Sequence, residues 1–102
     1  MYQRSVDVPL GSPFNIASYS FLTHLLAKHC DLEAFDFVYF MGNCHIYEEH
    51  IIPLQEQINR IPFEFPILNI KAKKENINDY ILDDFELLNY KCYDTIKMKM
   101  IA

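Results

Sequence analysis

The fold is decided by residues 12–30, which read SPFNIASYSFLTHLLAKHC. Ser12 and Pro13 predict the start of a helix, because serine can cap a helix and proline at the first helical position loses no needed donor. From Phe14 to about Cys30 the apolar residues recur at helical spacing and occupy nearly every side of the helix. A helix that is apolar all round is usually buried, so we expect a central helix packed inside the protein.

Other elements are expected on both sides of this helix. Residues 1–8 look extended, and the aromatic and β-branched run 37–47 is typical of a strand. A second helix is expected over 48–60, where Glu48 and Glu49 suit the positive end of the helix dipole. The remaining expected elements are strands over 67–70, 85–90 and 96–101, and one helical turn within the acidic stretch 75–85. The fold class is therefore α+β, with a mixed sheet packed against the buried helix.

Length and composition limit the class of protein. With 102 residues the chain has room for one core, and 51% hydrophobic against 23% charged residues excludes a disordered polypeptide. No apolar run approaches the roughly 18 residues of a membrane helix, and Arg4 and Asp7 interrupt the stretch where a secretory signal would be apolar. We therefore expect a cytoplasmic protein without a membrane partner.

Charge and potential metal ligands exclude further classes. The net charge of −5 argues against nucleic acid as the main partner, because binding phosphates needs a basic face. The basic run at Lys71, Lys73 and Lys74 is more typical of a solvated turn. Three widely spaced cysteines predict reduced thiols, and no metal is expected because the candidate ligands lack helical i, i+4 spacing. Those candidates are His24, His29, His45, His50, Cys30, Cys44 and Cys92.

Two polar features near the N-terminus suit a nucleotide. Arg4 beside Ser5 suits the binding of a phosphate monoester, because the guanidinium donates two parallel hydrogen bonds. The alternative is a surface ion pair between Arg4 and Asp7. Asn15, near the start of an otherwise apolar helix, presents a planar amide that matches the edge of uracil. Its alternative role is to satisfy a backbone group near the helix start.

A third polar feature is the string His45-Ile46-Tyr47. Alternate strand residues point the same way, so His45 and Tyr47 share a face while Cys44 and Ile46 point away. This geometry excludes a catalytic pair of Cys44 and His45. Two polar rings on one face could hold a sugar hydroxyl, and the alternative is an edge-strand pair facing water.

Short strings along the whole chain match one family signature. In order they are Tyr2-Gln3-Arg4-Ser5-Val6-Asp7, Leu10-Gly11, Pro13-Phe14-Asn15-Ile16-Ala17-Ser18-Tyr19, Leu22-Thr23-His24, Asp31-Leu32-Glu33, Asp36-Phe37, Gly42-Asn43, His45-Ile46-Tyr47, His50, Pro53-Leu54, Gln57, Arg60, Pro62, Phe65-Pro66 and Thr95-Ile96-Lys97-Met98-x-Met100. This set resembles thymidylate synthase, and the resemblance covers essentially all 102 residues.

The resemblance implies an enzyme of thymidylate biosynthesis. The family converts dUMP to dTMP by reductive methylation with the co-substrate 5,10-methylenetetrahydrofolate, after a cysteine thiolate adds to C6 of the uracil. Residues 1–102 would be the C-terminal third of the catalytic domain, a single incomplete domain. The nucleophilic cysteine would lie upstream, so the isolated segment is expected to be inactive. The complete enzyme is expected to be a homodimer, and the run 59–63 resembles that of bifunctional relatives that also carry dihydrofolate reductase.

The resemblance also implies which residues bind dUMP. Arg4 and Ser5 would bind the phosphate, and His45 and Tyr47 would hold the 3′-hydroxyl of the deoxyribose. Asn15 would read uracil at N3 and O4, and with His45 it would support catalysis. The other residues implied to line the nucleotide are Val6, Asp7 and Ile46.

Folate contacts and the alternatives complete the expectations. The resemblance implies that Asp7 faces the pterin, that Phe14 contacts the aromatic part of folate, and that Ile101 contacts folate as the tail closes. A related dCMP hydroxymethylase is disfavoured, because that activity is marked by aspartate at the position of Asn15. The other alternative is a truncated, non-catalytic product or interaction module that keeps the nucleotide-binding residues.

Overall fold

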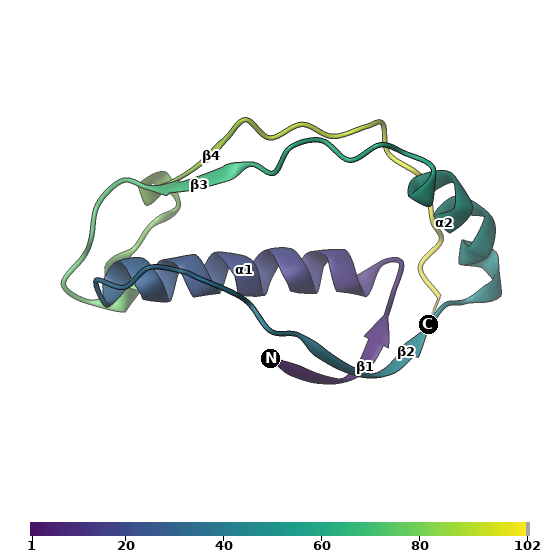
Figure 1. Cartoon of the computed structure of the whole chain (residues 1–102), viewed down its shortest axis with the longest axis horizontal. Coiled ribbons are helices and arrows are strands. Elements are labelled where there is room, and N and C mark those ends of the chain that lie inside the picture. Colours follow the sequence, from purple (N-terminus) through teal and green to yellow (C-terminus); the bar gives the residue numbers. More distant parts are fainter. Residues whose placement is uncertain (102) are drawn as a thin grey trace.

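The computed structural model describes residues 1–101 and contains two α-helices and two separate two-stranded sheets (Figure 1). The elements are β1 (Tyr2–Asp7), α1 (Gly11–His29), β2 (Phe40–His45), α2 (Ile51–Ile58), β3 (Ile67–Ile70) and β4 (Phe85–Leu88), with short 3-10 turns η1 (Glu48–His50), η2 (Ile77–Asp79) and η3 (Leu82–Asp84). The radius of gyration is 16.2 Å, whereas a compact domain of this length has about 13 Å. The α+β class is confirmed, in an open arrangement.

The first sheet pairs β1 with β2 in parallel, and its register aligns Ser5 with Asn43 and Asp7 with His45. The strands approach closely where Gly42 faces Arg4, since a Cβ at Gly42 would lie 2.6 Å from the Arg4 carbonyl oxygen. Any larger residue at position 42 would clash with the β1 backbone, so the pairing requires glycine there. Val6, between these pairs, is fully buried.

The second sheet is the antiparallel hairpin of β3 and β4, with Ile70 opposite Phe85. It lies along the C-terminal half of α1 (Figure 1). Phe85 packs against Phe21 of α1 with ring centroids 4.7 Å apart. Two ion pairs close this end, Lys74 with Asp84 at 3.0 Å and Lys73 with Asp31.

The helix expected over 14–30 is confirmed as α1, but its start and its burial differ from expectation. Helix α1 begins at Gly11, and the Ser12 hydroxyl donates to the Val8 carbonyl at 2.6 Å instead of capping. Only Ala27 is buried along α1, while Phe14 is 75% and Leu26 44% exposed. The expected burial of this helix is therefore absent within residues 1–101, because these residues cover few of its faces.

Other expected elements are shorter than the sequence suggested, and one is missing. The strand expected over 37–47 is reduced to β2, and the helix expected over 48–60 becomes η1 followed by α2. Two 3-10 turns lie within 75–85, and the strand expected over 85–90 ends at Leu88. The expectation of a strand over 96–101 was wrong, because these residues form no strand. A strand needs a partner for its backbone groups, and no described strand pairs with this segment.

Three further observations concern the cysteines, membrane-spanning helices and metal ligands. The thiols of Cys30, Cys44 and Cys92 are free and exposed. Among residues 1–101, no helix is long and apolar enough to cross a membrane. No group of three His, Cys, Asp or Glu side chains in that range is arranged to hold a metal ion.

Candidate functional site

Most of the expected site residues lie at the C-terminal end of the β1–β2 pair. Paired residues of parallel strands project to the same face, so Ser5, Asp7 and His45 share one face of the sheet. The His45 and Tyr47 rings meet edge to face with centroids 5.5 Å apart, as strand alternation predicted. Ile46, between them, is half exposed. The face thus combines a hydroxyl, a carboxylate and two polar rings.

Asn15 is brought to this face by the first turn of α1. A Cβ at Gly11 would touch the Asp7 Cβ at 3.4 Å and the Asn15 Oδ1 at 3.7 Å, so Asp7 and Asn15 both lie close to this glycine. The Oδ1 of Asn15 accepts a hydrogen bond from Gln3 Nε2 at 3.2 Å. The alternative role, in which Asn15 satisfies a backbone group, is not found among residues 1–101.

Gln3 is a positioning residue that the sequence analysis did not single out. Its amide oxygen accepts a hydrogen bond from the Tyr39 hydroxyl, and its amide nitrogen donates to both Ser5 O and Asn15 Oδ1. The side chain therefore fixes the orientation of the Asn15 amide. Because Tyr39 is 36 residues away, no local sequence pattern could have indicated this network.

Arg4 and Ser5 are both exposed on β1, with side chains on opposite faces of the strand by alternation. The expected alternative, an Arg4–Asp7 ion pair, is not formed within the described chain. Strand β1 has a neighbour on one edge only. Arg4 and Ser5 could both reach an anion at this open edge. They could not both reach an anion that lies on one face of the sheet.

Asp7 carries an unsatisfied polar atom at the centre of the cluster. Its Oδ1 is buried and lacks a hydrogen-bond partner among residues 1–101. A buried oxygen without a donor costs free energy, so such groups usually meet a ligand, a water molecule or another segment of protein. Asp7 is paired in register with His45, and its Cβ lies near the same glycine as the Asn15 amide, so its location suits contact with a polar ligand.

His50 is a second residue that the sequence analysis did not assign to the site. Its ring is 1% exposed and packs edge to face on Tyr47, with centroids 5.8 Å apart. Its Nε2 is 2.7 Å from the Lys99 carbonyl oxygen, so this bond holds the segment that contains Ile101 near the site. Phe14 is not drawn into the cluster: it is 75% exposed and makes no ring contact within the described chain.

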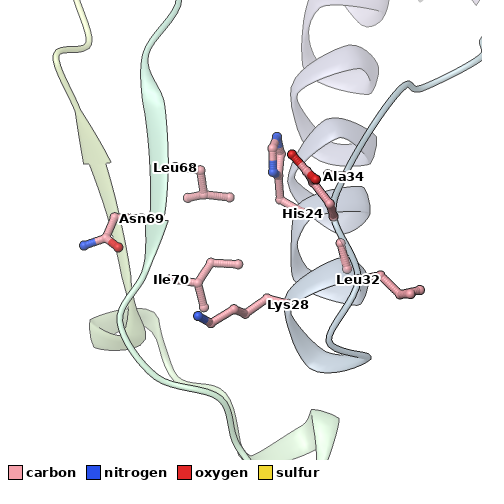
Figure 2. A pocket seen from close by; sticks show the side chains of 9 residues that line it. His24, Lys28, Leu32, Ala34, Leu68, Asn69 and Ile70 are labelled. Carbon is pink, nitrogen blue, oxygen red and sulfur yellow. The ribbon is translucent and has the colours of Figure 1, made fainter.

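The hollow in Figure 2 lies elsewhere, between the C-terminal half of α1 and β3. Its volume is about 310 Å³. His24, Leu68 and Ile70 project into the space between helix and strand, while Asn69 points away from it (Figure 2). None of the expected nucleotide or folate residues lines it. The two strongest pKa effects also lie at this end, where Lys73 lowers the pKa of Asp31 and the Ile81 N–H and Lys74 lower that of Asp84.

Comparisons with known proteins identify the family. A family profile described as thymidylate synthase matches residues 1–102. A bifunctional dihydrofolate reductase-thymidylate synthase of Paramecium tetraurelia is 52% identical over 100 residues, covering 98% of this chain and 21% of the relative. A bifunctional dihydrofolate reductase-thymidylate synthase 2 of Arabidopsis thaliana is 51% identical, with 98% and 18% covered. The corresponding protein of Plasmodium berghei (strain Anka) is 47% identical over 102 residues, with 100% and 17% covered. The chain spans about a fifth of the length of these relatives, and it belongs to the thymidylate synthase family.

Proposed function

We propose that this chain supplies a dUMP-binding face and a folate-contacting tail to a thymidylate synthase, which converts dUMP to dTMP with 5,10-methylenetetrahydrofolate. The observation that carries the proposal is the convergence of Asp7, Asn15 and His45 at one end of the β1–β2 pair. Membership of the family supports the same reaction class.

Asn15 is proposed to recognise the uracil ring. Gln3 occupies one lone pair of the Asn15 Oδ1, which orients the amide and leaves a second lone pair for the N3–H of uracil. The Nδ2 group then donates to O4. Negative charge develops on O4 when the thiolate adds to C6, so this donor also stabilises the reacting state.

The sugar and phosphate are proposed to extend along the two strands. His45 and Tyr47 offer two polar rings on one face, which suits the 3′-hydroxyl. Arg4 and Ser5 bind the phosphate at the open edge of β1, where both faces of the strand are within reach. The family resemblance implies a contact of Val6 with the nucleotide through backbone groups, although the whole residue is buried within residues 1–101. Ile46 lines the same segment.

The folate contacts are proposed around the nucleotide. The orphan oxygen of Asp7 faces the pterin ring, and Ile101 contacts folate from the tail segment held by His50. Phe14 is exposed on the first turns of α1 and is available to stack on the aromatic part of folate. In this arrangement the nucleotide forms one wall of the folate site.

The nucleophile is proposed to come from outside these residues. Cys44 precedes His45 on β2 and projects to the other face, while Cys30 follows α1 and Cys92 lies in the C-terminal region. We expect no turnover by the isolated chain. The complete enzyme is proposed to be a cytoplasmic homodimer in which further protein covers α1.

The test is a chimera, in which residues 1–102 replace the matching segment of the Paramecium tetraurelia relative. We expect the chimera to form dTMP from dUMP and 5,10-methylenetetrahydrofolate, with the relative as positive control. A folded chimera that binds neither substrate would contradict the proposal and would favour the non-catalytic alternative.

Asn15→Asp in the chimera tests the uracil assignment. We expect the ratio of kcat/KM for dUMP over dCMP to fall by about 100-fold, because a carboxylate cannot donate to O4 and leaves a polar group unpaired. Asn78→Asp, an identical change at an exposed position of η2, is the matched control. An unchanged nucleotide preference in Asn15→Asp would overturn the assignment.

A further inference from the structure

His50 joins two parts of the molecule that are far apart in the sequence. Its ring, 1% exposed, is the end of a row of three rings, His45, Tyr47 and His50, which we term the ring row. Adjacent ring centroids in the row are 5.5 Å and 5.8 Å apart, in edge-to-face geometry. Such packed aromatic pairs hold one another in defined orientations.

The Nε2 atom of His50 contacts Lys99, which belongs to residues 94–101, a segment that we term the tail. A carbonyl oxygen can only accept, so Nε2 carries the hydrogen and donates to Lys99 O at 2.7 Å. The remaining ring nitrogen, Nδ1, is buried without a partner among residues 1–101. The tail carbonyl is therefore the ring's hydrogen-bond partner in the described chain.

Two other contacts hold the start of the tail, not its end. Arg60 Nη1 donates to Asp94 O at 2.7 Å, and the Tyr93 hydroxyl, just before the tail, donates to Ile61 O at 3.0 Å. Ile96 and Met98 then line a hollow of about 200 Å³ together with Pro9 and Leu10 of the turn after β1, and Gln57 and Arg60. The contact made by His50 lies beyond these, two residues before Ile101.

We propose that His50 is a positioning residue that couples the ring row to the tail. It holds Lys99, and through it Ile101, at the nucleotide end of the molecule. When a sugar hydroxyl fixes His45 and Tyr47, the rings that pack against His50 become more rigid. The tail then loses less conformational entropy on closing. The kinetic part of this inference rests on the proposed function, whereas the attachment of the tail to His50 does not.

Trypsin measures the attachment directly, because the carbonyl that accepts the hydrogen bond belongs to the Lys99–Met100 peptide bond. In the chimera we expect His50→Phe, which keeps a packed ring but no donor, to be cleaved after Lys99 about tenfold faster than the unmodified chimera. Tenfold is the effect of one hydrogen bond of ordinary net strength. We expect dUMP to slow this cleavage in the unmodified chimera and to slow it much less in His50→Phe.

Kinetics separate positioning from general stability. We expect His50→Phe to raise KM for 5,10-methylenetetrahydrofolate about tenfold while KM for dUMP changes less than about threefold. His50→Gln, whose amide nitrogen reaches the place of Nε2, should restore most of the folate KM. Tyr93→Phe removes a different hydrogen bond beside the tail and should leave both KM values unchanged.

Each outcome decides a separate statement. Cleavage of His50→Phe at the unmodified rate would overturn the attachment, whatever the activity of the chimera. If His50→Phe does not fold, the coupling is tested in the unmodified chimera alone. A rate of cleavage after Lys99 that dUMP leaves unchanged would then overturn the coupling. A chimera that does not turn over dUMP, with cleavage still dependent on His50, refutes the proposed function and leaves the attachment standing.

Discussion

The two ends of this molecule differ in which contacts hold them together. At the β1–β2 end, Val6 and His50 are buried and the strands approach at van der Waals distance around Gly42. At the α1–hairpin end Ala27, Ile70 and Asp84 are buried, but Phe35, in the connection that follows α1, is 97% exposed. The comparison shows that parallel strand pairing and a buried imidazole organise the candidate site, whereas the other end leaves a large apolar surface exposed.

Electrostatic contacts add little to the stability of the α1–hairpin end. The Lys73–Asp31 pair is exposed, and such pairs contribute little to stability. The Lys74–Asp84 pair is less exposed, and Asp84 also accepts the Ile81 N–H at 2.9 Å. The hairpin end is thus held by a small number of polar contacts and by the rings of Phe21 and Phe85.

The largest expected effect tests whether α1 becomes covered in a larger protein. Leu26→Ala in the chimera is expected to lower the free energy of unfolding by about 3 kcal/mol, because a buried leucine leaves a cavity. Urea denaturation measures it, and Lys28→Ala on the same helix should change stability by less than about 0.5 kcal/mol. A cost below about 1 kcal/mol for Leu26→Ala would mean that the 44% exposure of this side chain persists in the larger protein.

The second effect tests the close strand pairing at the other end. Gly42→Ala is expected to lower the free energy of unfolding of the chimera by about 2 kcal/mol, because the new Cβ would lie 2.6 Å from a backbone oxygen. Gly11→Ala is the matched control, since its Cβ would meet its nearest atom at an ordinary 3.4 Å. Equal stability of the two variants would show that β1 and β2 are not so tightly paired.

The smallest effect is the pH dependence of the hairpin end. The pKa values of Asp31 and Asp84 lie below their ordinary value of 3.8, because Lys73 pairs with Asp31 and because Asp84 binds the Ile81 N–H and Lys74. A lowered folded-state pKa gives stability that is fully present above the unfolded value and is lost as pH falls through the folded value. We therefore expect hydrogen-exchange protection of the Lys71 amide, which donates to Asp84 O, to fall below about pH 4.

Asp84→Asn sharpens the same comparison. This variant should weaken protection at Lys71 at neutral pH and reduce its dependence on acid, while protection of β1 and β2 amides stays unchanged. A parallel loss of protection at both ends would show that the two regions unfold as one cooperative unit.

Some features could be predicted because they depend on neighbours in the sequence. The helix from residue 14, the strand 67–70 and the shared face of His45 and Tyr47 follow from local periodicity, and the structure confirms them. The expected strand over 96–101 was wrong, because strand formation depends on a partner that periodicity does not reveal. The roles of the proposed site residues toward dUMP and folate stay predictions.

The sequence by itself determined the family and the α+β class, because strings such as Phe14-Asn15-Ile16-Ala17 carry that information locally. Only the tertiary structure decided that Gln3 orients Asn15, that the buried Asp7 Oδ1 has no hydrogen-bond partner among residues 1–101, and that His50 contacts the carbonyl of Lys99. These contacts join residues as much as 49 positions apart. Their geometry depends on how strands and turns pack, which no short-range pattern encodes.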